Sequence, residues 1–177
     1  MICNNLGKCV DKELNTKSAL NCDNHKICIQ SSDNRSNIKC EEKQKKYIFE
    51  NTQRNHIISY KMDGGIIVED KYVPIGTNRC DYLYVGQSNS GLNAILIELK
   101  GVDVPKALKQ LYDTLQRFNG FFLNCSSVYG RIIVTSSTPN LKASPQYVKL
   151  LKEFRKLNGN IKMAQGQLKE KDIELGI

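Results

Sequence analysis

The sequence predicts an α/β protein with a central mixed β-sheet flanked by helices. Two observations lead to this class. Short apolar runs separated by turn residues dominate residues 41–100, and two amphipathic helical patterns follow with another apolar run, 130–137, between them. A helix that lies between two strands favours a crossover connection, and therefore a sheet with both parallel and antiparallel neighbours.

The strands are expected mainly in the middle of the chain. Two of them are joined by the polar turn NTQRN (51–55), and a short strand, IIVE (66–69), follows the turn DGG. Next come CDYLYVGQ (80–87) and LNAILIELK (92–100), with the four residues SNSG (88–91) between them. The short turn predicts that these last two strands pair as a hairpin.

The two helices carry their own boundary signals. In residues 103–120, apolar side chains recur at three- and four-residue steps, and Asp103 is a suitable N-cap. Residues 144–159 repeat the pattern with Ser144 as N-cap. A last short strand is expected at NIKMAQGQL (160–168).

The first 40 residues differ in composition from the rest. They contain five of the seven cysteines and show little apolar periodicity. We therefore expect a Cys-rich irregular segment over residues 1–40 and a folded core over residues 41–177. Seven is an odd number and no secretory signal precedes the cysteines, so a complete disulfide framework is not expected and the protein is interpreted as cytoplasmic.

The Cys-rich segment contains a candidate site for structural Zn²⁺. Cys22, His25 and Cys28 follow one another at three-residue steps, and a fourth ligand would come from another cysteine, Cys3, Cys9 or Cys40. The usual zinc knuckle has two residues between its cysteines, whereas here a histidine interrupts a gap of five. Reduced and partly buried thiols are therefore the favoured interpretation.

The net charge of +8 favours a polyanionic partner, most often nucleic acid. No apolar run approaches the roughly 18 residues that span a membrane, so no membrane partner is expected. Basic residues in and before the second helix are candidates for phosphate contacts, although a solvated helix face explains them equally well: Lys142, Lys149, Lys152, Arg155 and Lys156.

Opposite charges end the apolar strand LNAILIELK. Alternate side chains share a face of a strand, so Glu98 and Lys100 are neighbours near its end. Hairpin pairing through residues 88–91 places Asp81 opposite Glu98. Two adjacent carboxylates repel each other unless a cation or proton intervenes, and Mg²⁺ or Mn²⁺ suits such oxygen ligands. A metal-bound water can act as a nucleophile, with Lys100 to orient it.

A structural explanation competes with this one. An E-x-K pair at a strand end is common by chance, and Glu98 and Lys100 would then form a surface ion pair of little energetic weight. Asp63, in the turn MDGG, is a further acid that would lie near the site, although a role in the turn is favoured.

The two segments resemble the PD-(D/E)xK nuclease superfamily, which includes many restriction endonucleases, junction resolvases and repair nucleases. Asp81 in CDYLYV takes the place of the motif's first acid, and Glu98-Leu99-Lys100 in LIELKG matches (D/E)xK. The resemblance implies a restriction-endonuclease-like core from about residue 56 to 136. It implies that Asp81 and Glu98 bind a divalent metal, that the carbonyl group of Leu99 completes the metal shell, and that Lys100 assists the water.

The chain departs from the superfamily pattern at several positions. Cys80 stands where the motif has proline. Some members carry an earlier glutamate on an N-terminal helix, and three residues here are equivalent candidates for it: Glu41, Glu42 and Glu50. Some members also carry a helical glutamine and tyrosine four residues apart, but Gln110 is followed four residues later by Thr114.

The sequence thus predicts a metal-dependent nuclease that hydrolyses DNA phosphodiester bonds, in a restriction or phage-defence setting. Cutting both strands of a duplex would call for a homodimer, since one such site hydrolyses one strand. The alternatives are a non-catalytic nucleic-acid-binding module that keeps the fold and a zinc-dependent protein-interaction module. The residues do not distinguish DNA from RNA.

Overall fold

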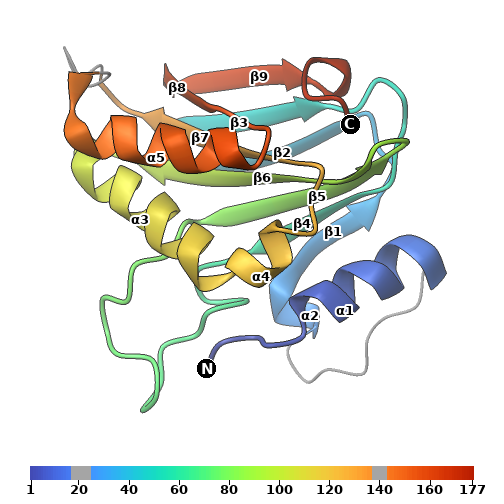
Figure 1. Cartoon of the computed structure of the whole chain (residues 1–177), viewed down its shortest axis with the longest axis horizontal. Coiled ribbons are helices and arrows are strands. Elements are labelled where there is room, and N and C mark those ends of the chain that lie inside the picture. Colours follow the sequence, from blue (N-terminus) through green and yellow to red (C-terminus); the bar gives the residue numbers. More distant parts are fainter. Residues whose placement is uncertain (17–24, 137–142) are drawn as a thin grey trace.

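The computed structural model describes residues 1–16, 25–136 and 143–177. A six-stranded sheet, which we call the main sheet, forms the centre of the molecule (Figure 1). Neighbouring strands are antiparallel as far as the fourth strand and parallel from there on. The predicted α/β class with a mixed sheet is therefore confirmed. The strands lie in the order β1 (Ile29–Asp33), β4 (Ile57–Lys61), β5 (Tyr82–Ser88), β6 (Gly91–Lys100), β7 (Ser127–Val134) and β8 (Ile161–Gln165).

Helices cover one face of the main sheet (Figure 1). The largest are α3 (Val104–Arg117) and α5 (Pro145–Lys156), which pack on each other and on β6 and β7. Both predicted N-caps form, because Asp103 and Ser144 accept hydrogen bonds from backbone N–H groups of the first turns. The shorter helices are α1 (Leu6–Asp11), η1 (Lys12–Thr16), α2 (His25–Cys28), α4 (Asn119–Phe122) and η3 (Asp172–Glu174).

A second, three-stranded sheet covers the other face of the main sheet, which the sequence pattern does not predict. It consists of β2 (Asn37–Glu42), β3 (Lys45–Glu50) and β9 (Gln167–Lys171), with β3 in the middle. β3 runs antiparallel to β2 and parallel to β9. The expected flanking by helices is thus correct for one face only.

The central strand β6 shows why the apolar run at residues 92–99 is nearly continuous. Ala94 and Leu96 belong to the core beneath the helices. Ile95, Ile97 and Leu99 belong to the core between the two sheets. A strand that is covered on both faces needs apolar residues at every position, and alternation is lost.

Several boundaries differ from the sequence-based expectations. The turn at 51–55 joins two strands as expected, β3 and β4, but these strands belong to different sheets. Residues 66–69 form only isolated bridges. Residues 160–168 divide between β8 and β9 at Gly166, whose φ of 70° allows a turn there.

The Cys-rich segment contributes regular structure to both sheets. Its residues form α1, α2, the edge strand β1 of the main sheet and most of β2. The expectation of an irregular segment is therefore wrong for the residues that the structure describes here, 1–16 and 25–40. β1 escaped detection because its sequence, IQSSD, is polar and only partly buried. None of the helices in the described ranges is long and apolar enough to cross a membrane.

Candidate active site

The β5–β6 hairpin brings the two predicted carboxylates together. Its register pairs Tyr82 with Ile97, and the predicted pairing of these strands is confirmed. Asp81 continues β5 by one residue and donates its backbone N–H to the carbonyl group of Ile97 at 3.1 Å. Asp81 and Glu98 therefore lie opposite each other at one end of the main sheet, as the turn position predicted.

The side chain of Asp81 is fixed by the neighbouring strand. Its Oδ2 atom accepts a hydrogen bond from the backbone N–H of Leu99 at 2.7 Å. Burial raises the pKa of Asp81 to about 6, although the bond from Leu99 works in the opposite direction. The negative charges of Glu42 and Asp63 also raise this pKa. An acid in such surroundings gains from a nearby cation.

Glu98 is almost completely buried, with 1% of its surface exposed. Its Oε1 atom lies 3.9 Å from Nζ of Lys100, while its buried Oε2 atom has no hydrogen-bond partner among the described residues. Burial first and the charge of Asp81 second raise the pKa of Glu98 to about 9. The interpretation of Glu98 and Lys100 as a surface ion pair is therefore wrong.

These residues lie in a cleft of about 460 Å³ at the end of the main sheet. Its walls come from the β2–β3 turn, the loop that precedes Asp81, the ends of β5 and β6, and the start of α3. Basic side chains line it beside the carboxylates, namely Lys43, Lys45, Arg79, Lys100 and Lys106. A cleft with both acids and bases can bind a metal ion and an anionic substrate together.

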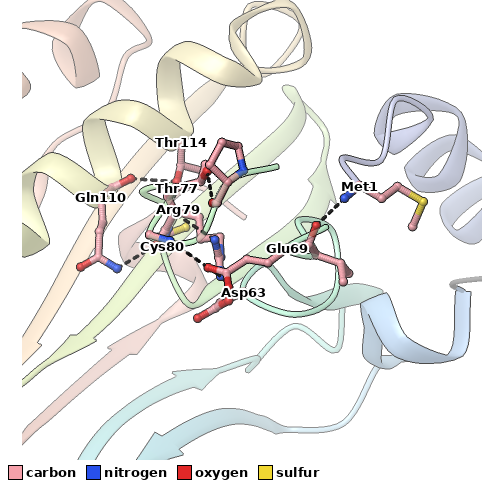
Figure 2. A network of polar contacts seen from close by, with 11 residues as sticks. Met1, Asp63, Glu69, Thr77, Arg79, Cys80, Gln110 and Thr114 are labelled. Carbon is pink, nitrogen blue, oxygen red and sulfur yellow. Dashed lines mark hydrogen bonds and ion pairs between the residues drawn. The ribbon is translucent and has the colours of Figure 1, made fainter. Parts of the chain in front are cut away.

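A polar network holds the backbone just before Asp81, as Figure 2 shows. The guanidinium of Arg79 donates to Asp63 at 2.7 Å and to Glu69 at 2.9 Å. From α3, Gln110 donates to the carbonyl group of Arg79 at 2.8 Å. The burial of Arg79 is thus compensated by two carboxylates, and the loop is tied to the helix.

Thr114 completes this network one residue nearer the site. Its hydroxyl accepts a hydrogen bond from the backbone N–H of Cys80 at 2.9 Å and donates to the carbonyl group of Gln110 at 2.8 Å (Figure 2). The residue that breaks the glutamine–tyrosine pattern thus supports the segment that carries Asp81. No sequence signal indicates this role, since a threonine inside a helix usually bonds only to its own helix.

The structure distinguishes between the candidate glutamates. Glu41 pairs with Lys46 at 3.1 Å and Glu50 pairs with Lys169 at 2.8 Å, both away from the cleft. Glu42 lines the cleft and raises the pKa values of both Asp81 and Glu98. It is the candidate that reaches the site, from strand β2 rather than from a helix.

Asp63 also lines the cleft, but its carboxylate is engaged by Arg79. Its side chain is half-exposed and acts on Glu98 through its negative charge. Asp63 therefore adds negative charge near Glu98. Its ion pair with Arg79 explains why an aspartate lies in this turn, and no direct contact with the reacting atoms is required.

A divalent metal fits the residues at the base of the cleft. The described ranges contain no group of three or more His, Cys, Asp and Glu side chains that could hold a metal ion. Mg²⁺, however, is commonly bound through only one or two carboxylates together with waters. The unpartnered Oε2 atom of Glu98 and the mutual repulsion of Asp81 and Glu98 both favour a cation there.

The zinc hypothesis is not tested by the structure. Cys22 and the side chain of His25 lie outside the described residues. Among the proposed fourth ligands, Cys40 lies in the core between the two sheets, whereas Cys9 belongs to the core beneath the helices. The main sheet separates these two layers, so Cys40 and Cys9 are not alternatives for the same position.

Some of the basic residues in and before α5 contact other side chains of the protein. The ammonium group of Lys149 lies 4.3 Å from the ring centroid of Tyr112, and Lys156 pairs with Glu153. Lys142 lies outside the described residues. These contacts favour a solvated helix face.

Comparisons with protein-family models, curated proteins and solved structures find no match to this chain. Function is therefore inferred from the geometry and chemistry of the cleft.

Proposed function

We propose that the protein is a metal-dependent nuclease that hydrolyses DNA phosphodiester bonds in the cytoplasm, in a restriction or phage-defence setting. The observation that carries this proposal is the pair Asp81 and Glu98. Two carboxylates lie opposite each other at a buried sheet end, one with an unpartnered oxygen, and a lysine stands two residues away. Such an arrangement destabilises the empty site and suits a bound cation.

The order of elements supports the same proposal. β4, β5 and β6 are followed by α3 and then by β7, which returns parallel to β6. This is the strand–strand–helix–strand order implied by the resemblance to PD-(D/E)xK nucleases. The first motif segment, CDYLYV, begins beside the cleft, and the second, LIELKG, ends there.

The chain's own residues supply positioning and charge. Asp81, Glu98 and the carbonyl group of Leu99 would hold the metal ion. When bound, the ion would polarise the phosphate and lower the pKa of a water molecule. Lys100 would donate a hydrogen bond from Nζ to the attacking water and offset negative charge as it develops. The water oxygen adds to phosphorus and passes a proton to solvent, one bridging P–O bond breaks, and the departing oxygen takes up a proton from solvent and leaves as a hydroxyl group.

The decisive experiment is a cleavage assay on supercoiled plasmid, single-stranded DNA and RNA, with Mg²⁺, Mn²⁺ or EDTA. The variants are Asp81→Ala and Lys100→Ala, with Lys46→Ala as a control for a lysine on the outer face of β3. We expect metal-dependent cutting that falls by at least about a hundredfold in the two site variants and is kept in the control.

The outcomes separate the alternatives. Absence of cutting on every substrate with every metal would contradict the nuclease proposal. Salt-sensitive nucleic-acid binding that survives Asp81→Ala would then indicate the non-catalytic binding module, which the net charge of +8 favours as the second candidate.

A further inference from the structure

Lys45 lies outside the strands and helix that resemble a nuclease core, yet it lines the same cleft as Asp81 and Glu98. It is the first residue of β3 in the second sheet. Buried and half-buried positions alternate along β3, and Lys45 shares its buried face with Tyr47 and Phe49. Those two aromatic residues fill the core between the sheets. Lys45 is therefore the inward residue at the end of this core, where the cleft begins.

The ammonium group of Lys45 is buried without an acidic partner. The residue is 3% exposed, and its Nζ atom has a hydrogen bond of 3.5 Å to the carbonyl group of Lys43. Within the described ranges it forms no ion pair with a carboxylate. The other buried basic residues differ, because Arg79 pairs with Asp63 and Arg131 pairs with Glu170. A buried charge without a partner is costly, so Lys45 is suited to an anion from outside the chain.

The turn that precedes Lys45 is also held in an unusual conformation. Lys43 and Gln44 connect β2 and β3 with φ values of 43° and 66°. Such turns normally carry glycine or asparagine, because a side chain with positive φ is strained. Lys43 itself lines the cleft. The strained turn thus places a second lysine beside the buried one.

We propose that Lys45 binds a phosphate group of the nucleic-acid backbone, so that the second sheet forms one wall of the substrate site. This inference rests on the proposed nuclease function. Phosphate is the anion that fits, because Lys43, Lys45 and Lys106 line a cleft whose base is formed by the two candidate metal-binding carboxylates. A phosphodiester that reaches Asp81 and Glu98 brings negative oxygens past these lysines.

The test compares Lys45→Met with Lys46→Met. Both variants remove one positive charge from β3, but Lys46 pairs with Glu41 away from the cleft. Binding of fluorescein-labelled duplex and single-stranded DNA is measured by anisotropy in EDTA, so that no cleavage occurs, over a series of salt concentrations. Thermal unfolding is followed on the same samples. Lys45→Gln serves as a second variant if Lys45→Met does not fold.

We expect Lys45→Met to weaken binding by about tenfold or more and Lys46→Met to change it by about twofold or less. The slope of log affinity against log salt should fall by about 0.9 for duplex DNA in the Lys45 variant, as for the loss of one phosphate contact. Its melting temperature should be unchanged or higher, because the change removes a buried charge.

Three outcomes would overturn this inference. The first is wild-type affinity in Lys45→Met, the second is an equal loss of affinity in Lys45→Met and Lys46→Met, and the third is a loss that is matched by unfolding in both Lys45 variants. Failure of the proposed function is distinguishable from these, since the wild type itself would then cut no substrate with any metal, whether or not it binds nucleic acid. If the wild type cuts DNA and the Lys45 variants bind DNA as tightly as the wild type, the phosphate contact of Lys45 is rejected and the nuclease proposal stands.

Discussion

Glu98 illustrates how a single residue can destabilise a fold for the sake of a site. One of its carboxylate oxygens is buried without a hydrogen-bond partner, and the nearest cation, Nζ of Lys100, is 3.9 Å from the other oxygen. Asp81 adds a second negative charge. Leaving a buried polar atom unpaired costs about 1–3 kcal/mol, and more for a charged group.

Replacing Glu98 by Gln should therefore stabilise the metal-free protein. At neutral pH we expect Glu98→Gln to raise the free energy of unfolding by about 1–3 kcal/mol in EDTA, because the wild-type carboxyl, with its raised pKa, must take up a proton on folding and glutamine needs none. Mg²⁺ should raise the melting temperature of the wild type but not of the variant. Urea unfolding with and without the metal measures both effects, and Glu153→Gln on the surface of α5 is the control. Lower stability of Glu98→Gln in EDTA would contradict this interpretation.

At the scale of single residues, the sequence indicated which carboxylates lie together but not how deeply they are buried or which side chains surround them. Asp81 and Glu98 could be paired from the sequence because a short turn fixes the hairpin register. The burial of Glu98 could not be predicted, because it depends on tertiary packing around the end of β6. The access of Glu42 and Lys45 to the cleft could not be predicted either, because it depends on how the second sheet packs on the main sheet. The alternation of Lys45, Tyr47 and Phe49 was the available signal for an inward lysine.

At the level of elements, α3 acts as a support for the end of β5. Thr114 and Gln110 bond to the backbone at Cys80 and Arg79, directly before Asp81. The helix could be predicted with its N-cap, since its apolar period and capping residue are local signals. Its contact with the loop before β5 could not, because that contact depends on tertiary packing.

Thr114 is expected to be a positioning residue. Thr114→Val keeps the shape but leaves the buried N–H of Cys80 without its acceptor, which should cost about 1–3 kcal/mol of stability. Because Asp81 is the next residue, the rise in melting temperature on adding Mg²⁺ should also shrink. Thr114→Ser keeps the hydroxyl and should restore the metal effect. A Thr114→Val variant with the full wild-type response to Mg²⁺ would show that the hydrogen bond is structural only.

For the whole molecule, a buried ion pair links the two sheets. Arg131 on β7 and Glu170 on β9 form a hydrogen-bonded pair with almost no exposed side-chain surface. Tyr47 on β3 donates to the same carboxylate at 3.2 Å. The sequence predicted the apolar part of β7 but not this pair, because one strand, β9, belongs to the sheet that the pattern did not indicate.

The charge of Glu170 should make stability depend on acid pH. Burial raises the pKa of Glu170, but Arg131 and Lys162 outweigh burial and lower it below the usual 4.5. At a pH between the native and the unfolded pKa of Glu170, the native state therefore keeps the carboxylate charged, whereas the unfolded chain takes up a proton. The stabilisation is present above the unfolded pKa and is lost as the pH falls through the lower native value.

Glu170→Gln should be destabilised by about 3–5 kcal/mol at neutral pH, because Arg131 is left buried with a weaker partner. Its loss of stability in acid should be shallower than that of the wild type. Urea unfolding over a pH series measures both, with Glu50→Gln at the partly exposed pair with Lys169 as the control. The double variant Arg131→Met/Glu170→Leu should recover much of the stability, and equal losses in single and double variants would contradict a buried-charge origin.

The parallel pairing of β3 with β9 also has a consequence for the order of folding. Five of the six strands of the main sheet, β4 to β8, lie between these two strands in the sequence, and β9 follows β8 after the turn at Gly166. Contacts between such distant segments close large loops and form slowly. β4, β5, β6, α3 and β7 are joined by shorter connections and can assemble earlier. We therefore expect the wall that carries Lys45 to be the last part of the cleft to form, so that a refolding chain brings Asp81 and Glu98 together before Lys45 reaches the cleft.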